Sequence, residues 1–220
     1  NTQSISVAGD AVLNSRGGGI FYSGNSTAAP TILDNQLIEN IASPLGPLAG
    51  YGGGMYLSGL ASPALVSGNT LDGNIAGHNL DGLGGGIYIA DSFLTLRDNV
   101  LTHNSATWAG NHGEGGGLYI SGGSVLAQFN QFIENYAAGF PGSPSDATGS
   151  GGGAALAGGN STLQYNTFQE NYGTRGENWG MGGGIYAHLG EHQILSNDIS
   201  ENYATIYESG YGGGVAISGC

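Results

Sequence analysis

The sequence predicts an all-β fold in which short parallel strands of successive repeats stack into a solenoid. Three observations favour it. A Gly-Gly-Gly triplet occurs seven times, at intervals of 35, 32, 31, 36, 31 and 30 residues, and such a period is typical of repeat architectures. After each triplet, hydrophobic residues alternate with other side chains at the period of a β-strand. No segment shows the sustained apolar period that a helical repeat needs.

The first strand of each repeat is expected to begin at the triplet. The first and third positions after the triplet are hydrophobic in all seven repeats, so we expect them to face the core. Because like side chains on adjacent strands stabilise a sheet, a structural role for the position between them is favoured over the stacking of a ligand. This outward column is mostly aromatic: Phe21, Tyr56, Tyr88, Tyr119, Ala155, Tyr186 and Ala216.

A second and a third strand are expected in each repeat. The second carries an inward column about ten residues after the first strand: Ile32, Val66, Leu96, Ala127, Leu163 and Ile194. We expect the third strand to lie between two asparagines. These asparagines are expected at corners, because Asn tolerates the left-handed backbone conformation, and like asparagines of successive repeats are expected to hydrogen-bond to one another. The motif is Asn-x-Φ-x-x-Asn, with Φ Leu, Phe or Ile, and its pairs are Asn35/Asn40, Asn69/Asn74, Asn99/Asn104, Asn130/Asn135, Asn166/Asn171 and Asn197/Asn202.

Three short strands in a repeat of about 31 residues indicate a right-handed parallel β-helix. We predict about six full rungs, a rung being one turn of the solenoid, with incomplete rungs at both ends and residues 1–220 in a single domain. The 45 glycines agree, because glycine is costly inside helices and suits corners and close approaches of the backbone.

Two short motifs resemble the repeats of the polymorphic outer-membrane proteins. They are Gly-Gly-Gly-Ile-Tyr and Phe-x-x-Asn, the latter at Phe132–Asn135 and Phe168–Asn171. They are also similar to the generic parallel β-helix repeats of large bacterial surface proteins. The resemblance covers almost the whole chain and implies a β-helix from families that include adhesins and autotransporter passengers. It supplies no catalytic residues.

The charge balance argues against several partners. The chain has 16 acidic residues, three arginines and no lysine, for a net charge of −13. Without a basic patch, binding to nucleic acid or to anionic membranes is disfavoured, and polyanionic sugars would need bridging calcium. No segment is apolar enough to cross a membrane, and no signal peptide precedes Asn1. We therefore expect a processed or trimmed chain at an extracellular or cell-surface location, with no cofactor unless loop acids hold calcium.

The variable segments between the second Asn of one repeat and the next triplet are expected to form one surface, which we call the loop face. Repeat proteins commonly bind ligands on such a face. Its acidic residues and histidines include Asp81, Glu114, His78 and His112. Either its aromatic residues pack over the loops' own backbones, or they bind a neutral glycan by stacking and hydrogen bonding: Trp108, Phe140, Trp179, Tyr207 and Tyr211.

A polysaccharide-active enzyme is another alternative, because many β-helix proteins act on polysaccharides. A uronate lyase usually needs a Lys or Arg base and clustered calcium ligands, and this chain has no lysine. A hydrolase needs closely placed carboxylates, which the sequence does not bring together. His188 and His192 lie four residues apart, a spacing that pairs metal ligands on a helix, whereas this segment is predicted as strand and turn. We therefore expect a non-enzymatic protein.

The two ends of the chain indicate a structural function. The tail supplies a first strand and the head a second, and exposed solenoid ends invite pairing with another chain. A head-to-tail contact that does not close into a ring generates a filament. The main prediction is therefore a self-assembling surface fibre, and the alternatives are a fragment of a longer glycan-binding adhesin or passenger and a polysaccharide-active enzyme. The expected contact residues are Ser4, Ile5, Val7, Val215 and Ile217, with Cys220 at the junction.

Overall fold

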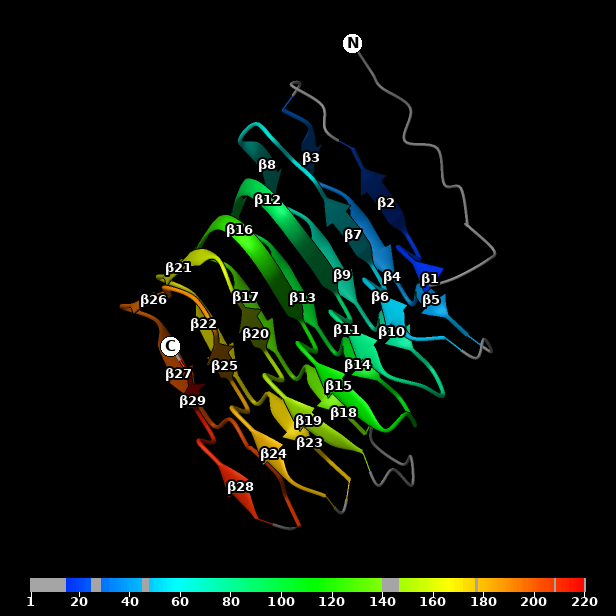
Figure 1. The fold of residues 1–220 in the computed structure, drawn as a ribbon, viewed down its shortest axis with the longest axis vertical. Helices are drawn as coiled ribbons and strands as arrows, with labels where there is room; N and C mark the ends of the chain where they lie inside the picture. The colour runs from blue at the N-terminus through cyan, green and yellow to red at the C-terminus, as the bar shows by residue number, and fades with distance from the viewer. Residues whose placement is uncertain are drawn as a thin grey trace.

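The chain folds into a parallel β-solenoid of about six rungs, as predicted. The computed structural model describes residues 15–24, 29–44, 48–139, 147–176, 178–207 and 209–219. These residues form strands, turns and bends without a helix, and their strands pair in parallel from rung to rung (Figure 1). Ile87, for example, pairs with Met55 on one side and with Leu118 on the other.

The first and second predicted strands belong to one sheet, which we call sheet 1. In β12 and β16 the two strands run on without a break over 11 residues. Within the described residues its members are β2 (Ile20–Ser23), β3 (Thr31–Leu33), β7 (Met55–Ser58), β8 (Ala64–Ser67), β12 (Ile87–Arg97), β16 (Leu118–Gln128), β20 (Ala154–Ala157), β21 (Asn160–Gln164), β25 (Ile185–His188), β26 (Gln193–Leu195) and β29 (Val215–Ser218).

The third predicted strand of each rung forms sheet 2. It comprises β4 (Gln36–Ile38), β9 (Thr70–Asp72), β13 (Val100–Thr102), β17 (Gln131–Ile133), β22 (Thr167–Gln169) and β27 (Asp198–Ser200).

Two further sheets lie where the sequence predicted variable loops. Strands this short, rich in Gly, Ser and Thr, carry no alternation that would predict them. Residues on both sides of the predicted loops therefore belong to the solenoid. Sheet 3 follows the second Asn: β5 (Ile41–Ser43), β10 (Ile75–Gly77), β14 (Ser105–Thr107), β18 (Tyr136–Ala138) and β23 (Tyr172–Thr174). Sheet 4 precedes the triplet: β1 (Ser15–Arg16), β6 (Gly50–Tyr51), β11 (Gly82–Leu83), β15 (His112–Glu114), β19 (Thr148–Ser150), β24 (Gly180–Met181) and β28 (Gly210–Tyr211).

The core is a continuous column of the predicted inward side chains. Ile87, Leu96 and Leu101, one from each predicted strand of a single rung, are all fully buried. Phe132 and Phe168 stack in the core with ring centroids 4.5 Å apart. Each rung therefore buries its apolar side chains mainly against the rungs next to it, as expected of a solenoid.

Both columns of asparagines form the predicted ladders. Asn69 donates from its side-chain Nδ2 and from its backbone N to Oδ1 of Asn99, at 2.9 Å each. Asn99 repeats this arrangement with Asn130. Because these side chains are almost fully buried, each amide depends on its neighbours for hydrogen bonds that water cannot replace.

The left-handed backbone conformation lies one residue before each Asn, so our expectation that the asparagines themselves adopt it was wrong. The Asn uses its backbone to bond neighbouring rungs: N of Asn69 donates into the ladder, and its carbonyl accepts from Val100 at 2.9 Å. The preceding residue must therefore make the bend. These corner residues are Asp34, Gly68, Asp98, Phe129, Tyr165 and Ser196 in one column, and Glu39, Gly73, His103, Glu134, Glu170 and Glu201 in the other.

The Gly-Gly-Gly triplet is required at the corner between sheets 4 and 1. Its first glycine has a positive φ, which is +65° at Gly84. Its second glycine lies directly against sheet 3, so that a Cβ on Gly85 would come within 2.4 Å of the carbonyl carbon of Ser105. The triplet is therefore needed both for the bend of the chain and for the close approach of its backbone to that of sheet 3.

Candidate functional site

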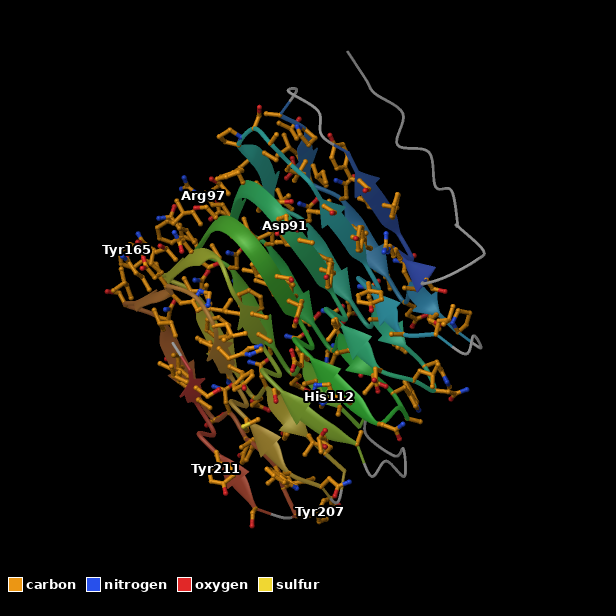
Figure 2. The ribbon with its side chains drawn as sticks, viewed as in Figure 1. Asp91, Arg97, His112, Tyr165, Tyr207 and Tyr211 are labelled. Carbon is orange, nitrogen blue, oxygen red and sulfur yellow. The ribbon has the colours of Figure 1, made fainter. Side chains whose placement is uncertain are left out.

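Three of the predicted aromatic residues of the loop face are exposed. Trp179, Tyr207 and Tyr211 are 58%, 69% and 59% exposed. They belong to neighbouring rungs, since β24 pairs with β28, and Thr205 Oγ1 donates to the carbonyl of Asn178 at 3.4 Å. Figure 2 shows Tyr207 and Tyr211 at one end of the solenoid. This part of the loop face offers aromatic surface to a ligand.

Trp108 behaves differently. It is half-buried, and its indole stacks on the ring of His78 with centroids 5.6 Å apart and planes 5° apart. This is the packing alternative, in which an aromatic side chain covers its own loops. Phe140 lies outside the described residues.

His112 and Glu114 lie on strand β15 instead of on a loop. His112 Nε2 is 3.0 Å from Glu114 Oε1, and its Nδ1 is 3.0 Å from Thr148 Oγ1. The hydrogen bond to Glu114 raises the pKa of His112, against the effect of burial and with help from the charges of Glu114 and Asp81. Within the described part of the chain, no group of three or more His, Cys, Asp or Glu side chains is arranged to hold a metal ion. The prediction of no cofactor, with calcium on loop acids as the alternative, stays a prediction.

His188 completes this polar cluster from two rungs away. Its Nε2 lies 3.9 Å from Glu114 Oε2, and its ring stacks on Tyr186 with centroids 5.0 Å apart. To do so, its side chain reaches across the rung of Ala155, where the aromatic column has no ring. Glu114 therefore lies between two imidazoles, and a second carboxylate, Asp81, accepts a hydrogen bond from the backbone N of His112 at 3.0 Å.

The outward aromatic column of sheet 1 stacks as predicted. Phe21, Tyr56, Tyr88 and Tyr119 follow one another with ring centroids 5.2, 5.1 and 5.4 Å apart. Tyr56 and Tyr119 are only 6% and 8% exposed, so they leave little surface for a ligand. Burial raises the pKa of Tyr88 to about 12, which keeps its phenol neutral at physiological pH. We call these four residues the buried stack, although Phe21 and Tyr88 are only half-buried, and their packing supports a structural role.

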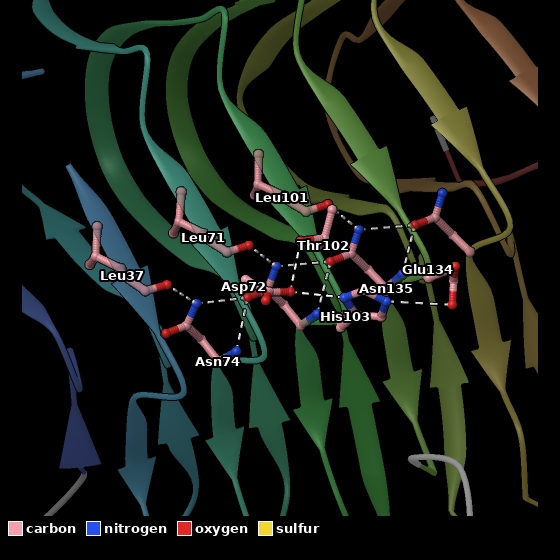
Figure 3. A network of polar contacts seen from close by, with 11 residues as sticks. Leu37, Leu71, Asp72, Asn74, Leu101, Thr102, His103, Glu134 and Asn135 are labelled. Carbon is pink, nitrogen blue, oxygen red and sulfur yellow. Dashed lines mark hydrogen bonds and ion pairs between the residues drawn. The ribbon is translucent and has the colours of Figure 1, made fainter. Parts of the chain in front are cut away.

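A polar network runs along the outside of sheet 2 (Figure 3). His103 Nδ1 is 2.8 Å from Asp72 Oδ1, and its Nε2 is 3.6 Å from Glu134 Oε2. Burial raises the pKa of Asp72, but hydrogen bonds from His103 and Thr102 outweigh it, so the pKa lies below its ordinary value. The side chains of Asp72, His103 and Glu134 are each more than one-third exposed, so the network links neighbouring rungs at a gain of less than about 1 kcal/mol per pair.

Two further exposed aromatic side chains were not predicted from the sequence. Phe129 and Tyr165 occupy left-handed corner positions on adjacent rungs, with φ of +56° and +57°. Their rings stack with centroids 5.4 Å apart, and they are 45% and 52% exposed. The guanidinium carbon of Arg97 lies 5.2 Å from the centroid of Phe129. We call Arg97, Phe129 and Tyr165 the corner row.

A shallow depression of about 540 Å³ adjoins the corner row at Arg97. Strands β8, β12 and β16, on three adjacent rungs, form its floor. Arg97 Nε donates to Asp98 Oδ2 at 3.0 Å, so its positive charge is matched. Its lining is part apolar and part polar: Pro63, Ala64, Leu65, Ser67, Thr95, Arg97, Asp98, Leu126 and Gln128.

One signal in the sequence could have revealed the corner row. The other ten corner positions hold Asp, Glu, Gly, His or Ser, and only Phe129 and Tyr165 place a hydrophobic ring there. That contrast becomes visible once the corner residue is known to precede the Asn.

Of the comparisons with known proteins, the family model agrees with the fold. No helix among the described residues is long and apolar enough to span a membrane. No match is found among curated proteins or among solved structures. Residues 1–148 of the 220 match the family model described as "Right handed beta helix region", and the chain therefore belongs to the right-handed β-helix family.

Proposed function

We propose that this protein is an extracellular, non-enzymatic β-helix protein that binds neutral glycans on its loop face. The observation that supports this most directly is the exposure of Trp179, Tyr207 and Tyr211, each with more than half of its surface open to solvent. Exposed apolar groups gathered on one face commonly mark a surface of interaction. A solenoid is a rigid support for them, because each rung is bonded to its neighbours on all four sheets.

The chemistry of these side chains suits sugars. Tyr and Trp offer a rigid ring face with a hydrogen-bonding group at its rim, and a sugar ring offers an apolar C–H face rimmed by hydroxyl groups. The net charge of −13 disfavours polyanionic chains. Neutral glycans are therefore the ligand class that this surface fits.

Calorimetry of the protein with neutral oligosaccharides tests the proposal. We expect Trp179→Ala or Tyr207→Ala to weaken binding by about 3- to 10-fold, because a stacked ring contributes roughly 0.5–1.5 kcal/mol. Phe93→Ala is the matched control, since Phe93 is also about half exposed but lies on β12 in sheet 1. If both loop-face variants bind as tightly as the wild type, the proposal is wrong.

Binding without turnover is part of the proposal. Incubation with neutral and acidic polysaccharides is expected to release no new reducing ends and no unsaturated products. Release that scales with protein concentration would identify an enzyme instead.

Head-to-tail assembly is a second candidate, and strand β29 favours it. Among the described strands β29 pairs with β25 alone, and Ile217 on its predicted inward face is 63% exposed. A second copy of the chain could extend the solenoid there. Ser4, Ile5, Val7 and Cys220 lie outside the described residues, while Val215 is half-buried. Light scattering should show mass that rises with concentration and falls in Ile217→Asp, whereas a monomer at every concentration would contradict assembly.

A further inference from the structure

We propose that the corner row and its depression form a second glycan-binding site, on the edge of the solenoid opposite the loop face, so that one chain can bridge two glycan segments. The ligand class follows the proposed function, but the site shares no residue with the loop face. It can therefore be tested separately.

The two surfaces lie on different sides of each rung. Tyr165 is at the corner between sheets 1 and 2, where β21 leads to β22, whereas Trp179 lies between sheets 3 and 4, just before β24. Figure 2 shows Tyr165 and Arg97 at one edge of the molecule and Tyr207 and Tyr211 at another. A ligand on one surface therefore leaves the other free.

Phe129 and Tyr165 hold a conformation that is unfavourable for them. A bulky residue in the left-handed region is uncommon, and such strain persists mainly where it serves a function. Neither ring gains full burial in return, because both remain about half exposed. The fold imposes the left-handed conformation at every corner but does not require a ring there, and a ligand that stacks on these two rings would give them a use.

Tyr165 is about half exposed and stacks on a ring at one face. Arg97 lies over one face of Phe129, and the rings of Phe129 and Tyr165 cover each other. The next corner in this column holds Ser196, and no ring or cation of the described residues stacks on that side of Tyr165. A sugar ring placed there would extend the row by one member.

The depression supplies the complementary polar contacts. Thr95, Ser67 and Gln128 offer hydroxyl and amide groups, beside the apolar side chains of Leu65 and Leu126. Such a mixture of apolar surface with a few polar groups is typical of ligand sites. Because the depression crosses three adjacent rungs and meets the corner row at Arg97, it fits several units of an extended chain.

The charges in the site favour a neutral chain. Arg97 is the only basic residue that lines the depression, and Asp98 already pairs with it. A uronate would meet the Asp98 carboxylate and the negative charge of the whole protein without a free cation to bind it. We therefore assign the site to neutral polysaccharides and expect it to reject uronate chains.

Tyr165→Asn is the sharpest test of the site. Asn tolerates the left-handed conformation, so this change removes the ring without adding strain at the corner. We would titrate wild type, Tyr165→Asn, a Trp179→Ala/Tyr207→Ala double variant and an Ile38→Ala control with hexasaccharides of glucose, mannose, xylose and N-acetylglucosamine. Ile38 is about half exposed but lies on β4 in sheet 2, and it lines neither surface. A galacturonate hexasaccharide is the charged control, and circular dichroism confirms folding of each variant.

We expect two hexasaccharides bound per wild-type chain, with one lost in Tyr165→Asn and the other in the double variant. The wild type should also cross-link and pellet the matching soluble polysaccharide, and each of these variants should fail to do so while still binding it. Wild-type stoichiometry in Tyr165→Asn would overturn the inference. Loss confined to Tyr165→Asn would instead support this site and reject the loop face, and absence of binding by the wild type would reject both.

Discussion

The buried stack and the corner row both contain aromatic rings that stack from one rung to the next, yet they differ in what surrounds these rings. Tyr56 and Tyr119 are nearly buried, on a regular strand. Phe129 and Tyr165 are about half exposed, at corners with a strained backbone. In a parallel solenoid, equivalent side chains of successive rungs lie over one another, so the stacking of rings needs no further explanation. Exposure combined with backbone strain is what distinguishes a candidate ligand site from a structural column.

The largest effect is expected from Tyr119→Ala in the buried stack. Loss of a buried aromatic side chain should destabilise the fold by about 3 kcal/mol, measured by chemical denaturation, because a cavity opens beside Tyr88. Ala155 and Ala216 in the same column show that the backbone accepts alanine there. Glycan binding at 20 °C or below should be unchanged. A stable variant with weakened binding would mean that the buried stack belongs to a ligand site after all.

Tyr165→Asn should have a much smaller effect on stability and the opposite sign. Relief of the left-handed strain, of roughly 1–2 kcal/mol, slightly exceeds the loss of one exposed stacking contact, of about 0.5–1.5 kcal/mol. We expect the variant to be as stable as the wild type or up to about 1 kcal/mol more stable by denaturant unfolding. A loss greater than about 1.5 kcal/mol would show that the corner row is structural, like the buried stack.

The smallest effect concerns the pH dependence of the cluster beside Tyr119. The pKa of His112 is raised in the folded protein, mainly by its hydrogen bond to Glu114. Its stabilising contribution is therefore complete below the ordinary pKa of 6.5 and is lost as the pH rises through the folded pKa. Because the side chain of His112 is 41% exposed, the contribution stays below about 1 kcal/mol.

Glu114→Gln should consequently lower the melting temperature more at pH 5.5 than at pH 8. Gln keeps the size of the side chain and removes its charge, so the change isolates the electrostatic contribution. An equal decrease at both pH values would show that His112 is not stabilised by this carboxylate.

The fold could be predicted from the sequence because each rung repeats the same constraints. The aromatic column recurs at a fixed offset from the Gly-Gly-Gly triplet, and the second inward column and the asparagine ladders recur at offsets that vary by no more than three residues, so each repeat supports the prediction made from the others. Sheets 3 and 4 could not be predicted, because strands such as Gly82–Leu83 are too short to show alternation. Their pairing depends on neighbouring rungs and not on local sequence.

The candidate sites were harder to predict than the fold. The position of Trp108 and Trp179 in the variable segments predicted that both lie on the loop face. The two differ in exposure, since Trp108 stacks on His78 and Trp179 is exposed. Phe129 and Tyr165 appeared as variable positions before an Asn. Their importance depends on the left-handed backbone conformation of the corner residue. The sequence analysis had assigned that conformation to the Asn instead of to the residue before it.

The corner columns also have a use beyond this protein. Each has one position per rung, and native corners hold Asp, Glu, His, Ser, Phe and Tyr as well as Gly. Because neighbouring parallel strands are about 4.8 Å apart, the columns present exchangeable positions at a regular spacing of about 4.8 Å. A chosen series of side chains could therefore be introduced along one edge by substitution at the corners, without changing the apolar core or the asparagine ladders.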